Sequence, residues 1–369
     1  MSAQPDAHPQ TVLVFSTLGA GSNDEYRIRE LASRHAHVVF PFDRSRKLAM
    51  FSALVKKIRR ERPDLVVMEG TGLAGGAALL LSRLLFGTKY VVSSGDAVGP
   101  WVGTKSRLLE WPFTWYERQL CSRASGFIGW TPYLAGRALT YGCPRAMTAP
   151  GWAPFTRTLA EQGEDRIRIR NVLGIGSNQL VVGIAGSLVW NARHKYCYGA
   201  ELVAAAAKVR RSDVTFLVIG DGNGMTHLKT AAAALPTGRV LFTGRIPQDA
   251  LPAYYAAMDF GSLPQSVDAV GSFRYTTKLS EYLAFGLPVL TGEIPLAYDL
   301  DDGWIARLPG FAPWDAVYTT ALAAFVDGLL PERLAAMQAA VPRNDPAFDR
   351  TRQIERANAF LGDLLRDRG

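Results

Sequence analysis

The decisive stretch of the chain is the run Thr277-Lys278-Leu279-Ser280-Glu281-Tyr282-Leu283-Ala284-Phe285-Gly286-Leu287-Pro288-Val289-Leu290. Thr277 is a residue type that favours the N-cap of a helix, and Gly286 is one that favours its end. Pro288-Val289-Leu290 then opens a strand. A helix followed at once by a strand indicates an α/β fold, in which ligands bind beyond the carboxyl ends of parallel strands.

The start of this helix has the features of an anion site. The N–H groups of Thr277, Lys278 and Leu279 and the positive end of the helix dipole would face a bound phosphate. Arg274 and Lys278 add full positive charges. Glu281 lies about one turn inside the helix, where it can accept hydrogen bonds from a ribose attached to that phosphate. The pattern predicts a nucleoside-diphosphate site, although an ordinary amphipathic helix with Glu281 in solvent fits the same residues.

Short β-rich runs alternate with helical patterns along the whole chain, which is typical of parallel sheets covered by helices. The runs are Thr11–Phe15, His37–Phe40, Leu65–Met68, Tyr90–Val92 and Gly126–Gly129, then Leu180–Ile184, Val214–Ile219, Val240–Phe242, Phe260–Leu263 and Pro288–Leu290. Residues 147–178 are rich in turn formers and then charged without a clear period, so we place the interdomain linker there. Residues 345–366 read as a charged helix.

Length and charge bound the class of protein. A chain of 369 residues suits two α/β domains better than one core. Lys and Arg outnumber Asp and Glu by 41 to 33, which gives a net charge of +8, so the surface attracts anions such as nucleotide phosphates or acidic lipid. Nothing resembles a zinc knuckle or an RNA-recognition signature, and we therefore expect no nucleic-acid partner.

The cysteines and the apolar runs indicate the compartment. Cys121, Cys143 and Cys197 are odd in number and widely spaced, which favours neither a disulfide framework nor a metal cluster. Residues 1–10 carry no apolar signal core, and the longest apolar run, 73–81, is too short to span a bilayer. We expect a cytoplasmic protein, with any membrane association peripheral and on the cytosolic face.

Glycine-rich loops follow three of the predicted strands. Gly19 and Gly21 lie after the first strand, but Asp24 stands where a dinucleotide fingerprint needs a third glycine, which argues against a dehydrogenase. Gly220-Asp221-Gly222 and Gly244-Arg245-Ile246 end two later strands. Each loop either brings backbone close to a ligand or is a simple turn.

The pattern Lys278-Leu279-x-Glu281-Tyr282-Leu283-Ala284-x-Gly286-x-Pro288-Val289 resembles the donor-binding helix of the retaining glycosyltransferases of family four. The resemblance is specific mainly between Gly183 and Leu290. It implies the GT-B fold, with two Rossmann-like, doubly wound parallel-sheet domains facing a central cleft. The implied acceptor domain is residues 1–155, with a C-terminal helix at 345–369 packing back on it, and the implied nucleotide-sugar domain is residues 156–344.

The resemblance also implies roles for individual residues. Gly19 and Gly21 face the acceptor and the donor diphosphate, Gly222 borders the donor pocket, and the backbone of Arg245 and Ile246 holds the base. The diphosphate is held by the helix start, at Arg274, Thr277, Lys278 and Leu279, and the ribose by Glu281. The chain departs from the family pattern at Tyr198, where a lysine usually precedes Gly199, and at Phe273, where a glutamate is usual.

Three residues are candidates for the chemistry. Breaking a sugar–diphosphate bond develops negative charge on the leaving group, which fixed cations stabilise. The resemblance implies Arg193 and Lys195 for this role, against a solvated basic loop. Asp96 follows the fourth strand and would orient an acceptor hydroxyl, or simply form a turn.

We therefore expect a metal-independent, retaining hexosyltransferase that needs no cofactor. It would move a sugar from a nucleotide-diphosphate donor to a hydroxyl of a glycan or lipid-linked acceptor, as in polysaccharide biosynthesis. The alternatives are a nucleotide-sugar epimerase or hydrolase on the same fold, and a non-catalytic partner subunit. Residues 100–118 are crowded with Trp and basic side chains, which favours a peripheral membrane contact, a sugar-stacking surface or simple core packing.

Overall fold

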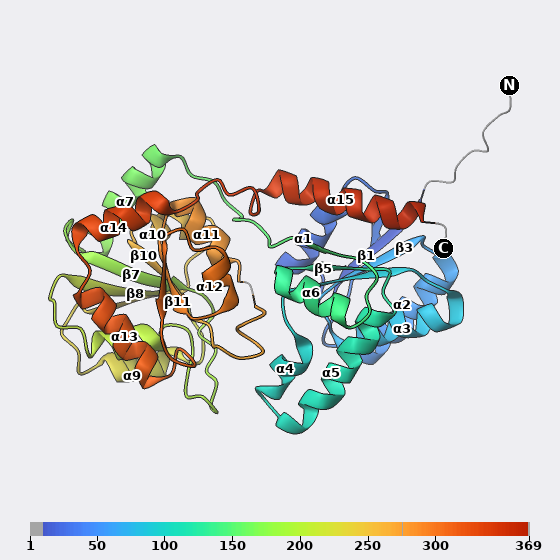
Figure 1. Cartoon of the computed structure of the whole chain (residues 1–369), viewed down its shortest axis with the longest axis horizontal. Coiled ribbons are helices and arrows are strands. Elements are labelled where there is room, and N and C mark those ends of the chain that lie inside the picture. The colour runs from blue at the N-terminus through green and yellow to red at the C-terminus, as the bar shows by residue number, and fades with distance from the viewer. Residues whose placement is uncertain (1–9, 275, 368–369) are drawn as a thin grey trace. The chain divides into compact units, whose positions relative to one another are not determined.

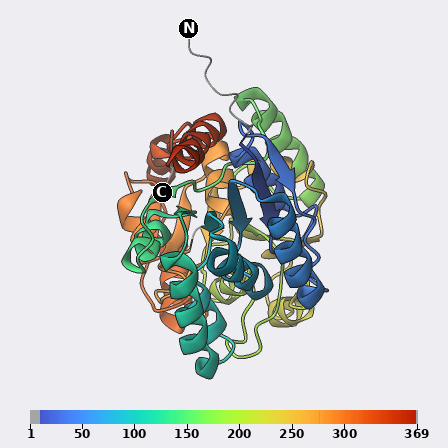
Figure 2. The same cartoon turned by 90° about the vertical axis from the view of Figure 1, so that its right-hand side faces the viewer.

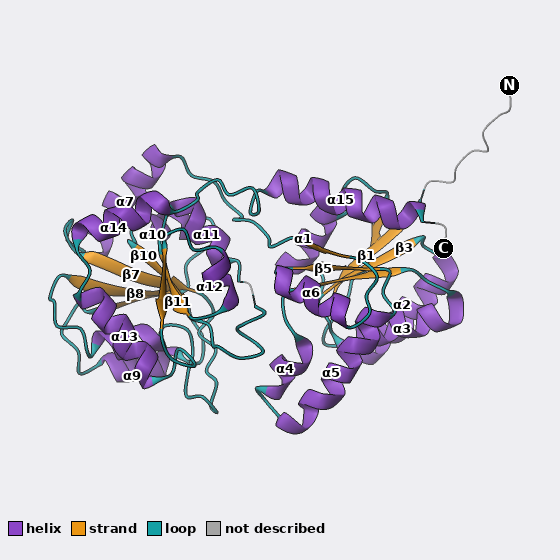
Figure 3. Ribbon diagram, viewed as in Figure 1, coloured by secondary structure: helices purple, strands orange, loops and turns teal. Residues whose placement is uncertain are grey.

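The computed structural model describes residues 10–274 and 276–367. Residues 1–9, at the N-terminus without a signal core, and residues 368–369 of the expected C-terminal helix lie outside the described residues. The chain divides into two compact units. Among the described residues, unit 1 comprises 10–151, 273–274 and 346–367, and unit 2 comprises 152–272 and 276–345. Figure 3 shows which segments are helix, strand and loop.

Unit 1 is built on a parallel sheet with the strand order β2-β1-β3-β4-β5-β6. Its strands are β1 (Val12–Ser16), β2 (His37–Val39), β3 (Leu65–Glu69), β4 (Tyr90–Ser94), β5 (Gly126–Gly129) and β6 (Ala146–Thr148). Its helices are α1 (Asn23–Leu31), α2 (Lys47–Glu61), α3 (Leu73–Phe86), α4 (Val98–Gly103), α5 (Arg107–Ser122), α6 (Pro132–Thr140) and α15 (Arg350–Arg366). Helices α1 and α15 cover one face and α2, α3, α5 and α6 the other (Figures 1 and 2).

Unit 2 repeats this plan with the strand order β12-β11-β10-β7-β8-β9. Its strands are β7 (Leu180–Ala185), β8 (Val214–Ile219), β9 (Val240–Gly244), β10 (Phe260–Leu263), β11 (Val289–Gly292) and β12 (Ile305–Leu308). Its helices are α7 (Leu159–Leu173), α8 (Ala200–Ala206), α9 (Met225–Ala232), α10 (Leu251–Ala256), α11 (Lys278–Phe285), α12 (Pro295–Asp299), α13 (Ala316–Asp327) and α14 (Pro331–Ala340). Helices α8, α9 and α13 pack together on one face, and α7, α10 and α11 on the other.

The central strands are apolar on both faces because helices cover both sides of each sheet. Every residue of β1, β3, β7 and β8 is buried. This explains why continuous runs such as Leu180–Ile184 predict strands, and the expected fold of two Rossmann-like parallel sheets is confirmed. Strands β6 and β12 were not predicted. They lie at sheet edges, where one neighbour is missing and no long apolar run is needed.

The charged segment 156–178, in which the sequence shows no clear period, contains the helix α7 over most of its length. The helix starts with a capping box, in which the Thr158 side chain accepts from the Glu161 N–H and the Glu161 carboxylate accepts from the Thr158 N–H. Apolar periodicity is weak because α7 attaches to the sheet partly through arginines. Sequence periodicity therefore gave no signal for this helix.

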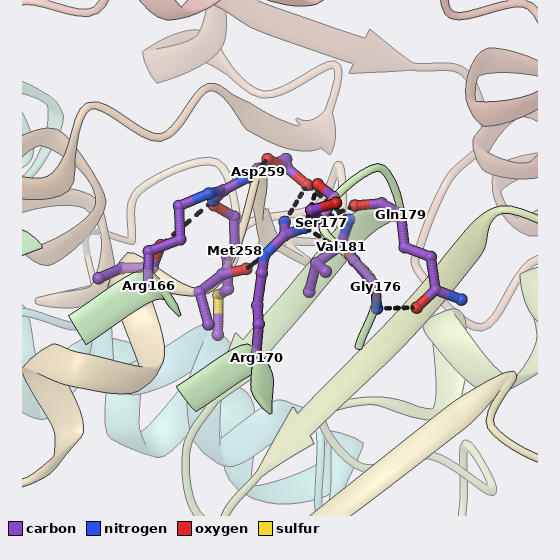
Figure 4. A network of polar contacts seen from close by, with 10 residues as sticks. Arg166, Arg170, Gly176, Ser177, Gln179, Val181, Met258 and Asp259 are labelled. Atoms are coloured by element: carbon purple, nitrogen blue, oxygen red, sulfur yellow. Dashed lines mark hydrogen bonds and ion pairs between the residues drawn. The ribbon is translucent and has the colours of Figure 1, made fainter. Parts of the chain in front are cut away.

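Arg170 of α7 and Asp259, just before β10, form the buried centre of a polar network (Figure 4). Their side chains are joined at 2.8 Å, and Asp259 also accepts from Arg166 at 2.5 Å and from the Val181 N–H at 2.7 Å. Arg170 donates further to main-chain carbonyls of Ala257 (3.0 Å), Gly176 (3.2 Å), Ser177 (3.2 Å) and Gln179 (2.9 Å). The network fixes the amino-terminal ends of β7 and β10 against α7.

Candidate functional site

The loops that follow β7 and β8 in unit 2 meet main chain to main chain. Gly220 has φ +131°, and a Cβ there would lie 1.9 Å from the carbonyl oxygen of Gly186. Gly222 is also too close for a side chain, since its Cβ would lie 2.4 Å from the Leu188 carbonyl oxygen. The Gly220 N–H donates to the Gly244 carbonyl oxygen of β9 at 2.9 Å. Glycine is therefore required for these loops to approach one another.

Helix α11 begins beside these loops, at the same carboxyl edge of the sheet. Thr277 precedes the helix but has helical φ and ψ, and its side chain makes no capping hydrogen bond. Thr277 therefore occupies the expected N-cap position without capping the helix through its side chain, because the turn already begins at Thr276, whose carbonyl accepts from the Leu279 N–H at 3.0 Å. The Leu279 side chain is fully buried in the core. Any contact of Leu279 with a ligand must come from its main chain.

The Lys278 ammonium lies where the β7 loop meets the start of α11. Its Nζ is 4.2 Å from the centroid of the Tyr198 ring, and a Cβ on Gly186 would lie 3.2 Å from it. Lys278 takes part in none of the ion pairs between described residues. A half-buried cation is thus placed against glycine backbone at the end of the first strand of unit 2.

Glu281 lies one turn further along α11, with its side chain turned toward α10. Its Oε2 accepts a hydrogen bond from the Tyr255 hydroxyl at 2.5 Å. Burial raises the pKa of the Glu281 carboxyl, while the Tyr255 hydroxyl and the Lys278 charge act in the opposite direction. This hydrogen bond holds the Glu281 carboxyl in one orientation. The other oxygen, Oε1, does not take part in the bond with Tyr255.

Glu201, which the sequence did not single out, is a buried carboxylate in the first turn of α8. It accepts from the Tyr196 hydroxyl at 2.9 Å, the Ser262 hydroxyl at 3.0 Å and the Gly199 N–H at 3.0 Å. Burial raises the pKa of the Glu201 carboxyl. The contacts anchor the turn that carries Tyr198. The available signal was a lone charge at the start of an otherwise apolar helix, Ala-Glu-Leu-Val-Ala-Ala-Ala.

Arg193 and Lys195 lie on the exposed part of the loop after β7. The Asn191 side chain accepts from the Arg193 N–H at 3.0 Å, and Lys195 has a left-handed backbone with φ +49°. Stacked rings hold the loop, with Trp190 on His227 at 4.0 Å and His194 on Trp314 at 4.3 Å between centroids. Arg245 is exposed and Ile246 half-buried just after β9.

A second polar cluster lies in unit 1, at the carboxyl ends of its strands. The buried Arg27 side chain pairs with Glu69 at 2.5 Å and donates to the Ser93 hydroxyl at 2.9 Å and the Ala149 carbonyl at 2.6 Å. Trp130 donates from Nε1 to the other Glu69 oxygen at 3.1 Å. Nearby, Gly19 and Gly21 have φ +110° and +75°. The cluster links α1, β3, β4 and the chain after β5 and β6.

Asp24 and Asp96 border this cluster. Burial raises the pKa of Asp24 to about 7, and the charges of Glu69 and Asp96 act in the same direction. Asp96 pairs with Arg274 at 3.0 Å, because residues 273–274 belong to unit 1. Phe273 packs there too, with its carbonyl accepting from the Thr131 hydroxyl at 2.9 Å. Two residues predicted for different roles, Arg274 and Asp96, are thus partners.

Neither a metal centre nor a membrane span is found in the described parts of the chain. Within residues 10–274 and 276–367, no group of three or more His, Cys, Asp or Glu side chains is placed to hold a metal ion. No helix in those residues is both long and apolar enough to cross a bilayer. The cysteines Cys121, Cys143 and Cys197 are free and buried.

Comparison with family models identifies both halves of the chain. Residues 3–150 match the glycosyl transferase 4-like domain, and residues 179–311 match the glycosyl transferases group 1 model. The chain is a group 1 glycosyltransferase. The second match covers both the glycine loops after β7 and β8 and helix α11, which contain Arg193, Lys195, Gly222, Lys278, Leu279 and Glu281.

Solved structures share the fold of this group 1 glycosyltransferase. HepE of Anabaena, in complex with UDP and glucose, superposes with a TM-score of 0.70 at 17% identity, covering 96% of this chain and 100% of HepE. Sucrose-phosphate synthase of Thermosynechococcus elongatus has a TM-score of 0.67 at 15% identity and covers 97% and 98%. At these identities the likeness establishes the fold alone.

A curated relative matches over a shorter region. The 2-deoxystreptamine glucosyltransferase of Streptomyces kanamyceticus is 35% identical over 134 residues. The match spans 35% of this glycosyltransferase and 34% of the relative. It therefore bears on one part of each chain.

Proposed function

We propose that this glycosyltransferase transfers a hexose, with retention of configuration and without a metal ion, from a UDP-sugar to an acceptor hydroxyl. The choice of UDP is supported by HepE, which is described in complex with UDP-glucose. The observation that carries the proposal is the placement of Lys278. A half-buried cation at the start of α11 lies against the glycine loop after β7, one turn from the oriented Glu281 carboxylate.

In this proposal the donor binds mainly to unit 2. The start of α11 and Lys278 bind the diphosphate, because a helix start and a cation both favour negative charge. Glu281 accepts hydrogen bonds from the ribose hydroxyls with the oxygen that Tyr255 leaves available. Gly222 gives the donor close access to main chain, and the backbone of Arg245 and Ile246 binds the base.

The proposed transfer needs no reagent other than the donor and the acceptor. The bond between the anomeric carbon and the β-phosphate oxygen breaks, and the acceptor oxygen attacks the same face of the sugar. The acceptor proton passes to the departing phosphate oxygen. Lys278 offsets the charge that develops on this oxygen, with Arg193 and Lys195 as further cations from the β7 loop. In unit 1, Asp96 orients the acceptor hydroxyl, and Arg274 positions Asp96 through their ion pair.

Lys278 also accounts for the unusual residue at position 198. The resembling family places a lysine directly before the glycine that opens α8, and this chain has Tyr198 there. The Lys278 ammonium lies over the Tyr198 ring, so the positive charge enters the same small region from α11 instead of from the β7 loop. The aromatic face stabilises the cation in the absence of substrate.

Moving this charge tests the proposal. We expect Lys278→Met to weaken UDP binding, measured by calorimetry, by about 10- to 100-fold, since a hydrogen bond to a charged group contributes roughly 1.5–3 kcal/mol. The double variant Lys278→Met/Tyr198→Lys should recover part of the affinity. Lys229→Met, at an exposed position of α9, is the matched control and should bind UDP as the wild type does.

Equal UDP affinity in the wild type and Lys278→Met would refute the proposed diphosphate site. The products then separate the remaining alternatives. Sugar release from UDP-glucose without any acceptor would indicate a hydrolase or epimerase, and acceptor-dependent release of UDP would indicate transfer. UDP binding with no turnover for any donor would indicate a non-catalytic subunit.

A further inference from the structure

Helices α4 and α5 form a hairpin that directly follows β4 in unit 1 (Figure 1). One face of α5 is fixed to the body of the unit. The Tyr116 hydroxyl donates to the Thr71 and Gly72 carbonyls at 3.3 Å, and the buried Glu117 pairs with Arg137 at 2.9 Å. The orientation of α5 about its own axis is therefore set by these contacts.

The opposite face of α5 exposes large apolar side chains. Leu108, Trp111 and Trp115 are 89%, 76% and 57% exposed, and their spacing of three and four residues places them on one stripe of the helix. Leu109 and, on α4, Trp101 are also exposed. A contiguous group of exposed Trp and Leu side chains marks an interaction surface. We call these five residues the α4–α5 stripe.

The charges around the α4–α5 stripe are mostly positive. Lys105 lies over the Trp101 ring at 4.1 Å, and Arg107 and Arg118 are exposed on α5. Glu110 is the exposed acid of α5, since Glu117 is buried and paired. Among the described residues named here, three exposed side chains (Lys105, Arg107 and Arg118) are positive and one (Glu110) is negative. Tryptophans flanked by Lys and Arg are the combination that the headgroup region of an anionic bilayer favours.

We propose that the α4–α5 stripe docks this glycosyltransferase on the surface of an anionic lipid bilayer. The Trp and Leu side chains enter the headgroup region, and Lys105, Arg107 and Arg118 bind lipid phosphates. The proposed docking does not depend on the proposed sugar transfer. Docking would nevertheless affect access of the acceptor, because the hairpin begins four residues after Ser94, at the strand end that carries Asp96. A lipid-linked acceptor would then reach unit 1 from the bilayer.

Vesicle flotation of the full chain tests the proposal. We expect binding to phosphatidylcholine vesicles that contain phosphatidylglycerol, no binding to phosphatidylcholine alone, and loss of binding at high salt. Arg107→Gln/Arg118→Gln should lower the partition coefficient by on the order of 30-fold, from about 1 kcal/mol for each basic residue near such a surface. Trp111→Ser/Trp115→Ser should abolish flotation.

Val317→Ser/Leu330→Ser is the matched control, because these unit 2 residues are 57% and 63% exposed and lie outside the α4–α5 stripe. It should float as the wild type does. Melting temperatures within experimental error of the wild type show that each variant is folded. Transfer to a water-soluble acceptor should stay unchanged in the tryptophan variant, which separates docking from catalysis.

Two results would overturn the proposal. Flotation of the tryptophan variant at the wild-type level would show that the α4–α5 stripe does not bind lipid. A wild type that does not float with the phosphatidylglycerol vesicles, but is a dimer by light scattering and becomes a monomer in Trp111→Ser/Trp115→Ser, would identify the stripe as a contact between two copies.

Discussion

Replacing Glu201 tests whether a buried carboxylate holds the donor loop in place. Glu201→Leu leaves three buried donors without an acceptor, the Tyr196 and Ser262 hydroxyls and the Gly199 N–H. Each unsatisfied group costs about 1–3 kcal/mol, and removal of a buried carboxylate offsets part of this. We expect a net loss of roughly 3 kcal/mol, or about 6–12 °C in the melting temperature of a domain of this size.

Glu201→Gln is the matched control, because an amide can satisfy the same groups. Its oxygen can accept from Gly199 and Tyr196, and its NH₂ group can donate to the Ser262 hydroxyl. We expect a loss below about 1 kcal/mol near pH 5. Because UDP contacts are proposed next to Tyr198, the leucine variant should also bind UDP more weakly than the glutamine variant does.

The pH dependence of stability provides an independent check. The folded-state pKa of Glu201 is raised above its ordinary value, so its contribution is fully present below the unfolded pKa and declines as pH rises through the folded pKa. Wild-type stability in urea should therefore fall from pH 4 upward more steeply than that of Glu201→Gln. Equal slopes of stability against pH in the wild type and Glu201→Gln would refute this reasoning. A melting temperature of Glu201→Leu within about 2 °C of the wild type would refute it as well.

Arg170→Met should lower the unfolding free energy by about 3–5 kcal/mol in urea titration, because the buried Asp259 loses its main partner; a loss below about 1 kcal/mol would contradict the network's role. Asp24→Asn should gain stability relative to the wild type by up to about 4 kcal/mol between pH 4 and pH 8, because the wild-type carboxyl has a raised pKa of about 7 and must lose its proton in that window; parallel pH profiles would exclude this. Gly220→Ala should destabilise by at least about 2 kcal/mol, since its Cβ would lie 1.9 Å from a carbonyl oxygen, whereas Gly136→Ala, in the open interior of α6, should be neutral or stabilising by about 0.5–1 kcal/mol in the same thermal melts.

Much of the fold could be predicted because both sheets are parallel and buried on both faces. Runs such as Val214–Ile219 have no polar alternation, so their strand character is visible without any structural information. The stop of α11 at Gly286 is equally local, since the residue adopts φ +62°. The edge strands β6 and β12 carry no such signal, because tertiary pairing rather than local sequence stabilises them.

The candidate site was harder to predict, because its residues depend on contacts between distant segments. The position of Lys278 at the glycine loop follows from the neighbouring places of α11 and β7 in unit 2. The partnership of Arg274 with Asp96 was not foreseen, since nothing local tells that residues 273–274 belong to unit 1. Glu201 was missed because its partners at positions 196, 199 and 262 are recognised only once β10 lies beside β7.

The main-chain contact between the loops after β7 and β8 has a consequence for how this enzyme can diverge. Positions 220 and 222 admit no side chain without a clash, so substitution there destabilises the fold before it alters any preference for a donor. A mutant library aimed at a new donor would lose most of its members if it included these positions. Productive diversity has to enter through neighbours with exposed side chains, such as Arg245, whose proposed contact with the base comes from its main chain. The loops thus consist of positions that must stay glycine and a small set of positions at which substitutions can be selected.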